Sequence, residues 1–180
     1  MCSGINGNAI GPILQRTDSV LAESNPQGVI LFWDSDVCDI SETKLSTSQI
    51  KELRDTYRKN LIATCNKILE TSYVAIAGPE MCGEGPVILN DESYYIELYQ
   101  SKLEMLEAYR DINKEVAEEL EVPYIDVRSA FIDAIGDWKY NNGCLTSDGE
   151  HPNNNGAIVE ANLFSYVINE WLRSSSGICK

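Results

Sequence analysis

The sequence alternates short apolar runs with long amphipathic segments, and this alternation limits the fold more than any other feature. Residues 29–33 and 73–77 are continuous apolar runs, and residues 122–127 form a third β-rich run. Runs of this kind are typical of parallel strands that helices cover on both faces. The spacing of apolar residues predicts helices over residues 10–23, 46–70, 93–120, 128–135 and 153–173. The chain is therefore predicted to be an α/β domain around a parallel sheet.

Two local signals refine the predicted helices. Ser46 followed by Gln49 is the pattern of a capping box at the start of the second helix. Asparagines at 153–155 can cap the last helix. The inner stripe of that last helix is predicted to contain Ile158, Ala161, Phe164, Ile168 and either Trp171 or Leu172.

Length and composition indicate one acidic globular domain over residues 1–180. With 14 Lys and Arg against 28 Asp and Glu, the formal net charge is -14, which argues against nucleic acid or an anionic membrane as partner. No apolar run reaches the length of a membrane span, and the first residues lack a signal pattern. The six cysteines form no Cys-x-x-Cys pair. We therefore expect reduced thiols, no metal ion and a cytoplasmic protein.

The only histidine of the chain lies in a polar stretch just before the last predicted helix. His151 is therefore the candidate general base, because imidazole titrates near neutral pH without a shifted pKa. Asp148 precedes it by three residues. A carboxylate at this spacing in a turn can hold one ring nitrogen and stabilise the imidazolium, while the other nitrogen faces outward. A lone Asp-x-x-His pair also occurs by chance in surface loops, so other parts of the chain must support this assignment.

The stretch Asp148-Gly149-Glu150-His151-Pro152-Asn153, together with the order of strands and helices, resembles the SGNH (GDSL-type) hydrolases. That resemblance implies a flavodoxin-like three-layer sandwich with a central parallel sheet. It also implies a Ser–Asp–His triad in which Asp148 is the acid and His151 the base. The implied reaction is hydrolysis of small acyl, carbohydrate-acetyl or lipid esters, without a cofactor.

Two further stretches resemble the family's oxyanion-hole blocks. Residues 4–8 precede a helix, and the backbone N–H of Gly7 would be one donor. Residues 30–37 run from a strand into Ser35, which stands where the family has an asparagine donor. Trp33 stands where the family has glycine. The resemblance thus implies an oxyanion hole near Gly7 and Ser35.

The family's first block, a strand that ends in Gly-Asp-Ser and carries the nucleophile, has no counterpart in these 180 residues. Ser3, Ser35 and Ser147 are alternative serines, but none follows a strand in the nucleophile's position. Relative to the family, the domain is therefore expected to be N-terminally incomplete and to lack its first strand, and a signal peptide would be lost with it. Strand 29–33 would then present an open apolar edge. We predict that this edge pairs with a second copy in a homodimer, or that the N-terminal segment covers it.

Three functions remain open from the sequence. The first is a serine esterase acting on a small-molecule ester. The second is a non-catalytic binding or scaffolding protein on the same fold, which the missing first block favours. The third is a metal-assisted hydrolase that uses Asp34, Asp36 and His151 as ligands, although nothing else in the chain has metal-ligand spacing.

Overall fold

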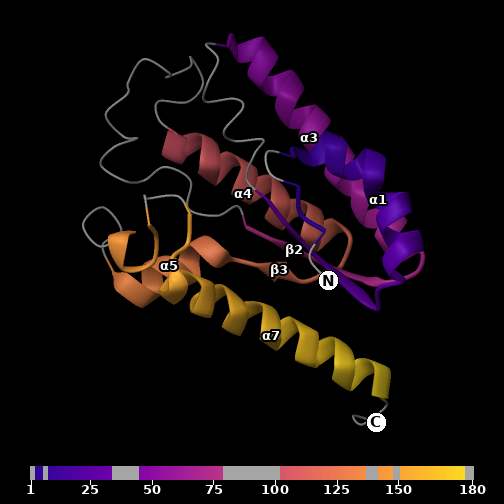
Figure 1. Ribbon diagram of the computed structural model, residues 1–180. Coiled ribbons are helices and arrows are strands. Elements are labelled where there is room, and N and C mark those ends of the chain that lie inside the picture. The colour runs from indigo at the N-terminus through magenta and orange to yellow at the C-terminus, as the bar shows by residue number, and fades with distance from the viewer. Residues whose placement is uncertain are drawn as a thin grey trace.

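The protein is a three-layer α/β structure with a parallel sheet between two layers of helices (Figure 1). The computed structural model describes residues 3–5, 8–33, 45–78, 102–136, 142–147 and 151–176. The strands are β1 (Gly28–Phe32), β2 (Tyr73–Ala77) and β3 (Tyr124–Ile125). The helices are α1 (Ile10–Ser24), α3 (Thr47–Leu69), α4 (Lys102–Glu119), α5 (Val127–Ile135), the 3-10 turn η2 (Asn142–Cys144) and α7 (Asn154–Ser176). The predicted fold class is confirmed.

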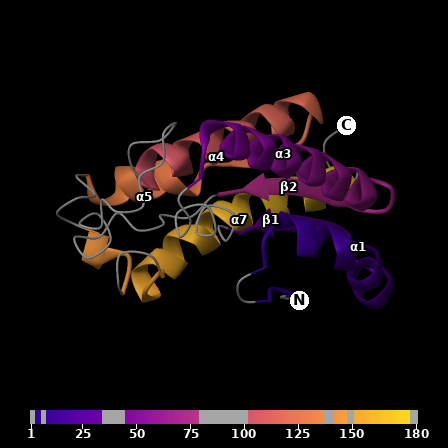
Figure 2. The ribbon, with the colours of Figure 1, turned by 90° about the horizontal axis from the view of Figure 1, so that it is seen from above.

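The sheet has the strand order β1-β2-β3, and both pairs of neighbours are parallel. Gly28 lies opposite Tyr73 and Phe32 opposite Ala77, so β1 and β2 pair along their full length. Helices α1, α3 and α4 cover one face, while α5 and α7 cover the other (Figure 2). Because both strand pairs are parallel, the carboxyl ends of all described strands lie at the same end of the sheet.

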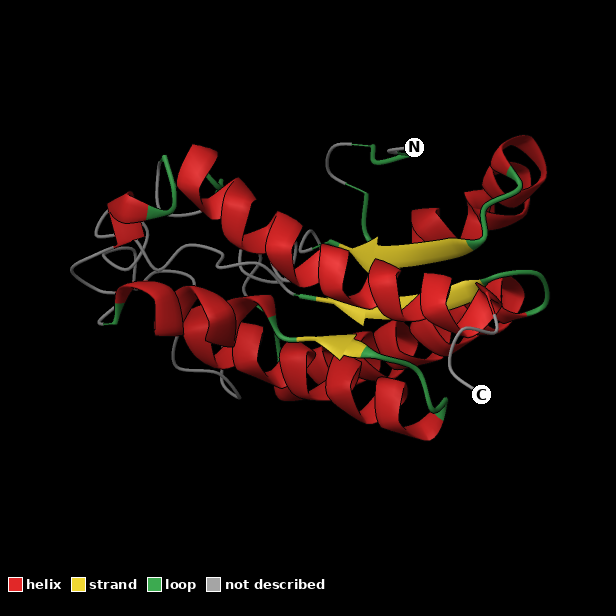
Figure 3. Ribbon diagram, turned by 90° about the horizontal axis from the view of Figure 1, so that it is seen from below, coloured by secondary structure: helices red, strands yellow, loops and turns green. Residues whose placement is uncertain are grey.

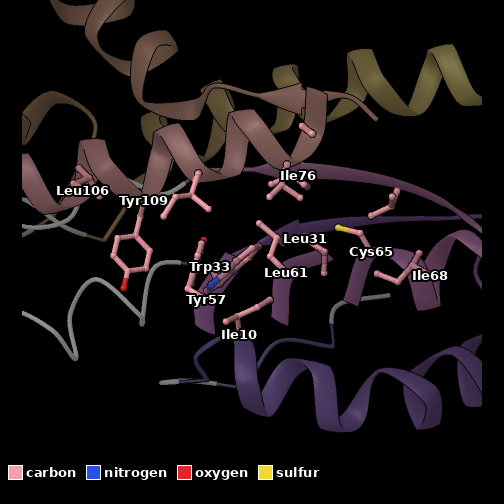
Figure 4. Packing of buried hydrophobic residues seen from close by; sticks show 14 of the residues in the cluster. Ile10, Leu31, Trp33, Tyr57, Leu61, Cys65, Ile68, Ile76, Leu106 and Tyr109 are labelled. Carbon is pink, nitrogen blue, oxygen red and sulfur yellow. The ribbon is translucent and has the colours of Figure 1, made fainter. Parts of the chain in front are cut away.

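Alternating side chains of the strands feed two separate cores. Leu31 and Ile76 pack with α1, α3 and α4, and the neighbouring Phe32 and Ala77 pack with α5 and α7. This alternation follows from the pleat, which turns successive side chains to opposite faces. In the first core, Cys65 is fully buried, and this burial raises the pKa of its thiol to about 12 (Figure 4). Cys65 and the exposed Cys144 are both free thiols, in line with the expectation of reduced cysteines at these two positions.

The predicted helices agree with the structure to within three residues wherever their ends are described. Ser46 caps α3 with a complete capping box, because its side chain accepts from the Gln49 N–H and its own N–H donates to the Gln49 side chain. Of the predicted helix 93–120, the residues before Lys102 lie outside the described part. Within α4, Leu106, Tyr109, Ile112 and Val116 are buried.

The predicted inner stripe of α7 is correct at Phe164 and Trp171, which pack against the core, and wrong at its other positions. Ile158, Ile168 and Leu172 are 59%, 42% and 53% exposed, and Ala161 is also exposed. The core-facing residues that the prediction lacked are Val159, Leu163 and Val167, and Gly156 is buried against the carbonyl of Leu145. Helix α7 has apolar residues on two faces, and periodicity alone cannot tell which of the two meets the core.

Strand β1 lies at the edge of the described sheet, as its expected open edge requires. Among the described residues, its only strand partner is β2. The carbonyl of Gln27 accepts from the Tyr73 N–H. By strand alternation, Gly28, Ile30 and Phe32 turn their backbone polar groups away from β2. Residues 3–5 and 8–9 lie on that side of the sheet but form no strand there (Figure 3).

An ionic network holds the junction between β3 and α5. Asp126 caps α5 by accepting from the Ser129 N–H, and Arg110 of α4 donates to both of its carboxylate oxygens. Arg110 also binds Glu107 at 2.8 Å, and Arg128 binds the other oxygen of Glu107. Burial alone would raise the pKa of each carboxyl, but the guanidinium groups outweigh it and lower the pKa of both Asp126 and Glu107.

We predict that this network makes the domain sensitive to acid. Both carboxyls have a lowered pKa in the folded state, so their stabilisation is complete above their unfolded pKa values near pH 4. It is lost as the pH falls through the folded values. Arg110→Met should lower the free energy of unfolding at pH 7 and weaken its further decline toward pH 3, as measured by urea unfolding at several pH values.

The matched control for this prediction is Arg58→Met. Arg58 pairs with Glu119, and both side chains are more than 40% exposed. Exposed ion pairs contribute about 0–1 kcal/mol, so the pH dependence of this variant should match that of the unmodified protein. An Arg110→Met variant with the unmodified pH dependence would contradict the prediction.

Candidate active site

His151 lies on a tight hairpin that precedes α7. The N–H of Ser147 donates to the carbonyl of His151 at 2.9 Å, and the N–H of Asn153 donates to the carbonyl of Leu145 at 2.8 Å. Thr146 and Pro152 form the antiparallel bridge between these two bonds. Three residues, 148–150, connect the two sides. The hairpin therefore holds the backbone on either side of the Asp-x-x-His segment in a fixed geometry, although Asp148 itself lies outside the described residues.

The base of this hairpin is buried, and the two described residues next to its turn are exposed. Leu145 and Thr146 are 5% and 2% exposed, and Leu145 is part of the core beneath α5 and α7. Ser147 and His151 are both exposed. An imidazole presented to solvent on a rigid base is suited to proton transfer with a bound ligand.

Asn153 joins the hairpin to α7. Its side-chain oxygen accepts from the N–H groups of Asn155 and Gly156 at 2.9 and 3.3 Å, which confirms the predicted cap. Its side-chain nitrogen donates to the carbonyls of Gly143 and Thr146 at 3.3 and 3.1 Å. One side-chain amide therefore forms hydrogen bonds both with the first turn of the helix and with the segment that leads to the hairpin.

Gly156 allows the hairpin to lie directly against α7. A Cβ atom at this position would lie 2.2 Å from the carbonyl oxygen of Leu145 and 3.0 Å from the Pro152 side chain. The residue is also buried. Only glycine permits this approach. Gly156 is therefore a sequence signal for the hairpin, in addition to the polar residues around His151.

The packing of α7 places this hairpin at the carboxyl end of the sheet. Phe164 meets Phe32, the last residue of β1, with ring centroids 5.3 Å apart. Further along α7, Trp171 lies against Gly28, the first residue of β1. Helix α7 therefore runs antiparallel to β1, and its beginning projects beyond the strand's carboxyl end (Figure 3). In open α/β sheets, ligands bind at this edge.

The predicted oxyanion residues, Gly7 and Ser35, lie outside the described residues, but their neighbours are anchored close together. Ile10, the first residue of α1, packs in the same core as Trp33, which follows β1 directly (Figure 4). Trp33 is 9% exposed, and its ring lies 5.9 Å from that of Tyr57. The indole is therefore a core side chain, which explains why a bulky residue is tolerated at the position of the family's glycine.

A buried polar network, which the sequence analysis missed, fixes the carboxyl end of β2. The carbonyl of Gly78 accepts from the Tyr124 hydroxyl at 2.9 Å and from the Asn113 amide at 3.3 Å. Asn113 is fully buried, and its side-chain oxygen accepts from the Tyr57 hydroxyl at 2.6 Å. Gly78 has a φ of 83°, which favours glycine. A glycine directly after an apolar strand was the available sequence signal.

Of the three alternative serines, Ser35 lies outside the described residues, and neither Ser147 nor Ser3 is positioned as a nucleophile. The Ser147 hydroxyl donates to the carbonyl of His151 at 3.1 Å, so this hydroxyl belongs to the hairpin's own bonding. Ser3 precedes α1 and follows no strand among the described residues. In the part of the chain that the structure describes, no group of three potential ligands could hold a metal ion. Asp34 and Asp36, the other two residues of the metal hypothesis, lie outside that part.

Known proteins resemble this chain in structure rather than in sequence. No protein-family model and no curated protein match it. An acetylxylan esterase from Geobacillus stearothermophilus is similar with a TM-score of 0.67 and 20% identity over 93% of this chain and 71% of that chain. A putative acylhydrolase from Bacteroides fragilis has a TM-score of 0.70 and 20% identity, with 94% and 74% covered. A GDSL-like lipase from Bacteroides thetaiotaomicron has values of 0.65 and 17%, with 93% and 74% covered.

These similarities show that the chain has the fold of the GDSL-type hydrolases. In the Geobacillus esterase, three catalytic mutants replace a serine near the start of that chain, an aspartate, and a histidine three residues after that aspartate. None of the described helices is long and apolar enough to cross a membrane.

We predict that Gly156→Ala disrupts the His151 hairpin. The added methyl group would overlap the Leu145 carbonyl, and overpacking of this kind costs about 1–3 kcal/mol. The free energy of unfolding should fall by this amount, and the imidazole signals of the only histidine should shift in the NMR spectrum.

Gly143→Ala is the matched control for this variant. Its added Cβ would meet nothing within 4 Å, so its stability should change by less than about 0.5 kcal/mol. Equal stability of the two variants would contradict the proposed close approach.

Proposed function

We propose that the protein is an ester hydrolase scaffold of the SGNH (GDSL) type, with Asp148 as acid and His151 as base. The observation that carries this proposal is the hairpin itself, which presents the only histidine at the carboxyl edge of a parallel sheet. A triad histidine needs this combination of a rigid base and an accessible ring.

Similarity to known esterases supports the assignment of the acid–base pair. The aspartate and histidine replaced in the Geobacillus catalytic mutants are three positions apart, as are Asp148 and His151. The proposed substrates are small acyl, carbohydrate-acetyl or lipid esters, and acetylxylan is the substrate of that neighbour. The proposal includes no metal ion or cofactor.

The proposed reaction is acyl transfer through a serine. The serine oxygen attacks the ester carbonyl while His151 accepts its proton, and Asp148 stabilises the resulting imidazolium. Backbone and hydroxyl donors at Gly7 and Ser35 would bind the oxyanion. His151 then returns the proton to the leaving alcohol. In the second half of the reaction water attacks the acyl-enzyme with His151 again as base, which releases the acid and restores the serine. The proposal assigns no particular serine as nucleophile.

The second candidate function is non-catalytic binding or scaffolding on the same fold. Two observations favour it. The chain contains no Gly-Asp-Ser string, and Trp33, at the position of the family's glycine, is buried against Tyr57. The third candidate, a metal-assisted hydrolase, has no such observation in its favour.

The proposed partners are a small ester and a second copy of the chain, which would meet it at the open edge of β1. Uncovered apolar edges promote association between chains. A nucleic-acid partner is not part of the proposal, because a net charge of -14 opposes it.

We predict hydrolysis of p-nitrophenyl acetate and labelling of one serine by a fluorophosphonate probe, both dependent on His151. His151→Ala and Asp148→Asn should each reduce hydrolysis by about 100-fold or more, because both act on the proton transfer. Peptide mass spectrometry of the labelled protein would identify the nucleophile.

Asp133→Asn is the control, since this exposed carboxylate lies on α5 outside the hairpin. It should leave hydrolysis unchanged. A folded protein that neither hydrolyses esters nor reacts with the probe would overturn the esterase proposal in favour of the binding function.

A further inference from the structure

The residues that precede α1 lie beside β1, on the side where the described sheet has no further strand. Figure 2 shows residues 3–5 and 8–9 on the side of β1 opposite β2, next to α1, and Figure 1 shows residues 3–5 between the layers of α1 and α7. Among the described residues, β2 is the only strand partner of β1. We call residues 3–5 and 8–9 the N-terminal segment. It lies on the approach to the open edge of β1.

Arg16 ties the N-terminal segment to α1. The Nη1 group of Arg16 donates to the carbonyl of Ser3 at 2.5 Å, across 13 positions of the chain. Within the segment, the N–H of Asn8 donates to the carbonyl of Ile5 at 3.1 Å. The chain then enters α1, whose first residue, Ile10, is buried in the core. The segment is thus attached both through α1 and through one guanidinium group.

The position of Arg16 on α1 explains why its side chain reaches this segment. Gly11 lies against Asn60 of α3, and Asp18 forms a salt bridge with Lys67 of α3. Positions 11 and 18 therefore mark the flank of α1 that faces α3. A helix turns by about 100° per residue, which places Arg16 on the opposite flank. Its guanidinium group extends away from α3, toward the segment beside β1.

The attachment of the N-terminal segment is incomplete. Among the described residues, the buried Nε of Arg16 finds no hydrogen-bond partner. Ile5 is 57% exposed, and the described residues of the segment form no strand with β1. A hydrogen bond from a charged group is stabilising, whereas a buried donor without an acceptor is destabilising. One bond from Arg16 therefore holds a segment whose backbone takes no part in the sheet.

A second copy would need the space that the N-terminal segment occupies. Gly28, Ile30 and Phe32 turn their backbone polar groups away from β2, and a strand from another copy would bond to these groups. Proteins commonly cover such an edge with a loop, which prevents pairing between chains. The N-terminal segment has the position of such a cover, so the segment and a second copy compete for one edge.

We propose that the N-terminal segment is an autoinhibitory cover for the open edge of β1, held by Arg16, and that a second copy pairs with β1 only after the segment has left. The inference rests on the second copy proposed above and adds the step that regulates its binding. The affinity for the second copy is then reduced by the fraction of chains whose edge is free. No residue of the His151 hairpin takes part, so the inference does not depend on esterase activity.

Sedimentation velocity of the full chain over a range of concentrations tests this competition. Arg16→Met removes the donor and keeps a long side chain, so it should lower the dissociation constant of the dimer by roughly tenfold or more. The same substitution changes the formal net charge from -14 to -15, which by itself opposes association. Tighter association would therefore not be an effect of charge.

Arg58→Met is the matched control for this measurement. It makes the same change in net charge, but Arg58 belongs to an exposed ion pair with Glu119 and has no contact with the N-terminal segment. This variant should not strengthen the dimer.

A second measurement reports on the segment without a dimer. At a concentration where the protein is monomeric, the heteronuclear NOE values of Ile5 and Asn8 should fall in Arg16→Met, because the released segment moves more freely. The amide of Ile30 should exchange with solvent about fivefold faster or more, since its outer side is no longer covered. The amide of Leu31, which strand alternation turns toward β2, should keep its exchange rate.

The two measurements separate the cover from the second copy. Unchanged NOE values and an unchanged exchange rate at Ile30 in Arg16→Met would overturn the proposed cover, and so would a dimer that this variant does not strengthen. A released segment in a protein that stays monomeric at every concentration would overturn the second copy as partner and, with it, the autoinhibitory role. Fluorophosphonate labelling of the same samples reports on the esterase proposal separately.

Discussion

The structure depends on the burial of β2 between two neighbouring strands and two layers of helices. Four of its five residues are buried, and both of its edges are paired in parallel. In a parallel sheet all strands end on the same side. The segments that follow the strands therefore lie together although they are far apart in the chain. Trp33, Gly78 and Asp126 each follow a strand at that edge. The position of the candidate site therefore follows from the common direction of the strands.

Hydrogen bonds, a salt bridge and side-chain packing then fix the residue that follows each strand. Gly78 is held by Tyr124 and Asn113, and Asp126 is held by Arg110. Trp33 is held by packing against Tyr57, whose hydroxyl also supports Asn113. Tyr57 therefore connects the ends of β1 and β2 through one side chain. Buried polar groups stabilise a structure only when their hydrogen bonds are complete, so the bonds among Tyr57, Asn113 and Gly78 hold the ends of β1 and β2 in one arrangement.

The sequence predicted what depends on local pattern and failed where two patterns compete. The strands, the capping box at Ser46 and the Asn153 cap could be predicted because each has a local signature. The inner face of α7 could be predicted only in part, since Val167 and Ile168 are adjacent apolar residues and tertiary packing alone decides which is buried. The network around Asn113 was missed because its partners lie on α3, β2 and β3, at separations that no sequence window covers.

The close approach of Gly156 to Leu145 also bears on how the histidine moves. A histidine on a surface turn ordinarily samples many positions within nanoseconds. Here the Asn153 side chain bonds to the first turn of α7, and the carbonyl of Leu145 lies directly against Gly156 of that helix. The backbone at His151 should therefore be displaced only when α7 itself frays, so its motion follows the opening of a helix and not the fluctuation of a loop.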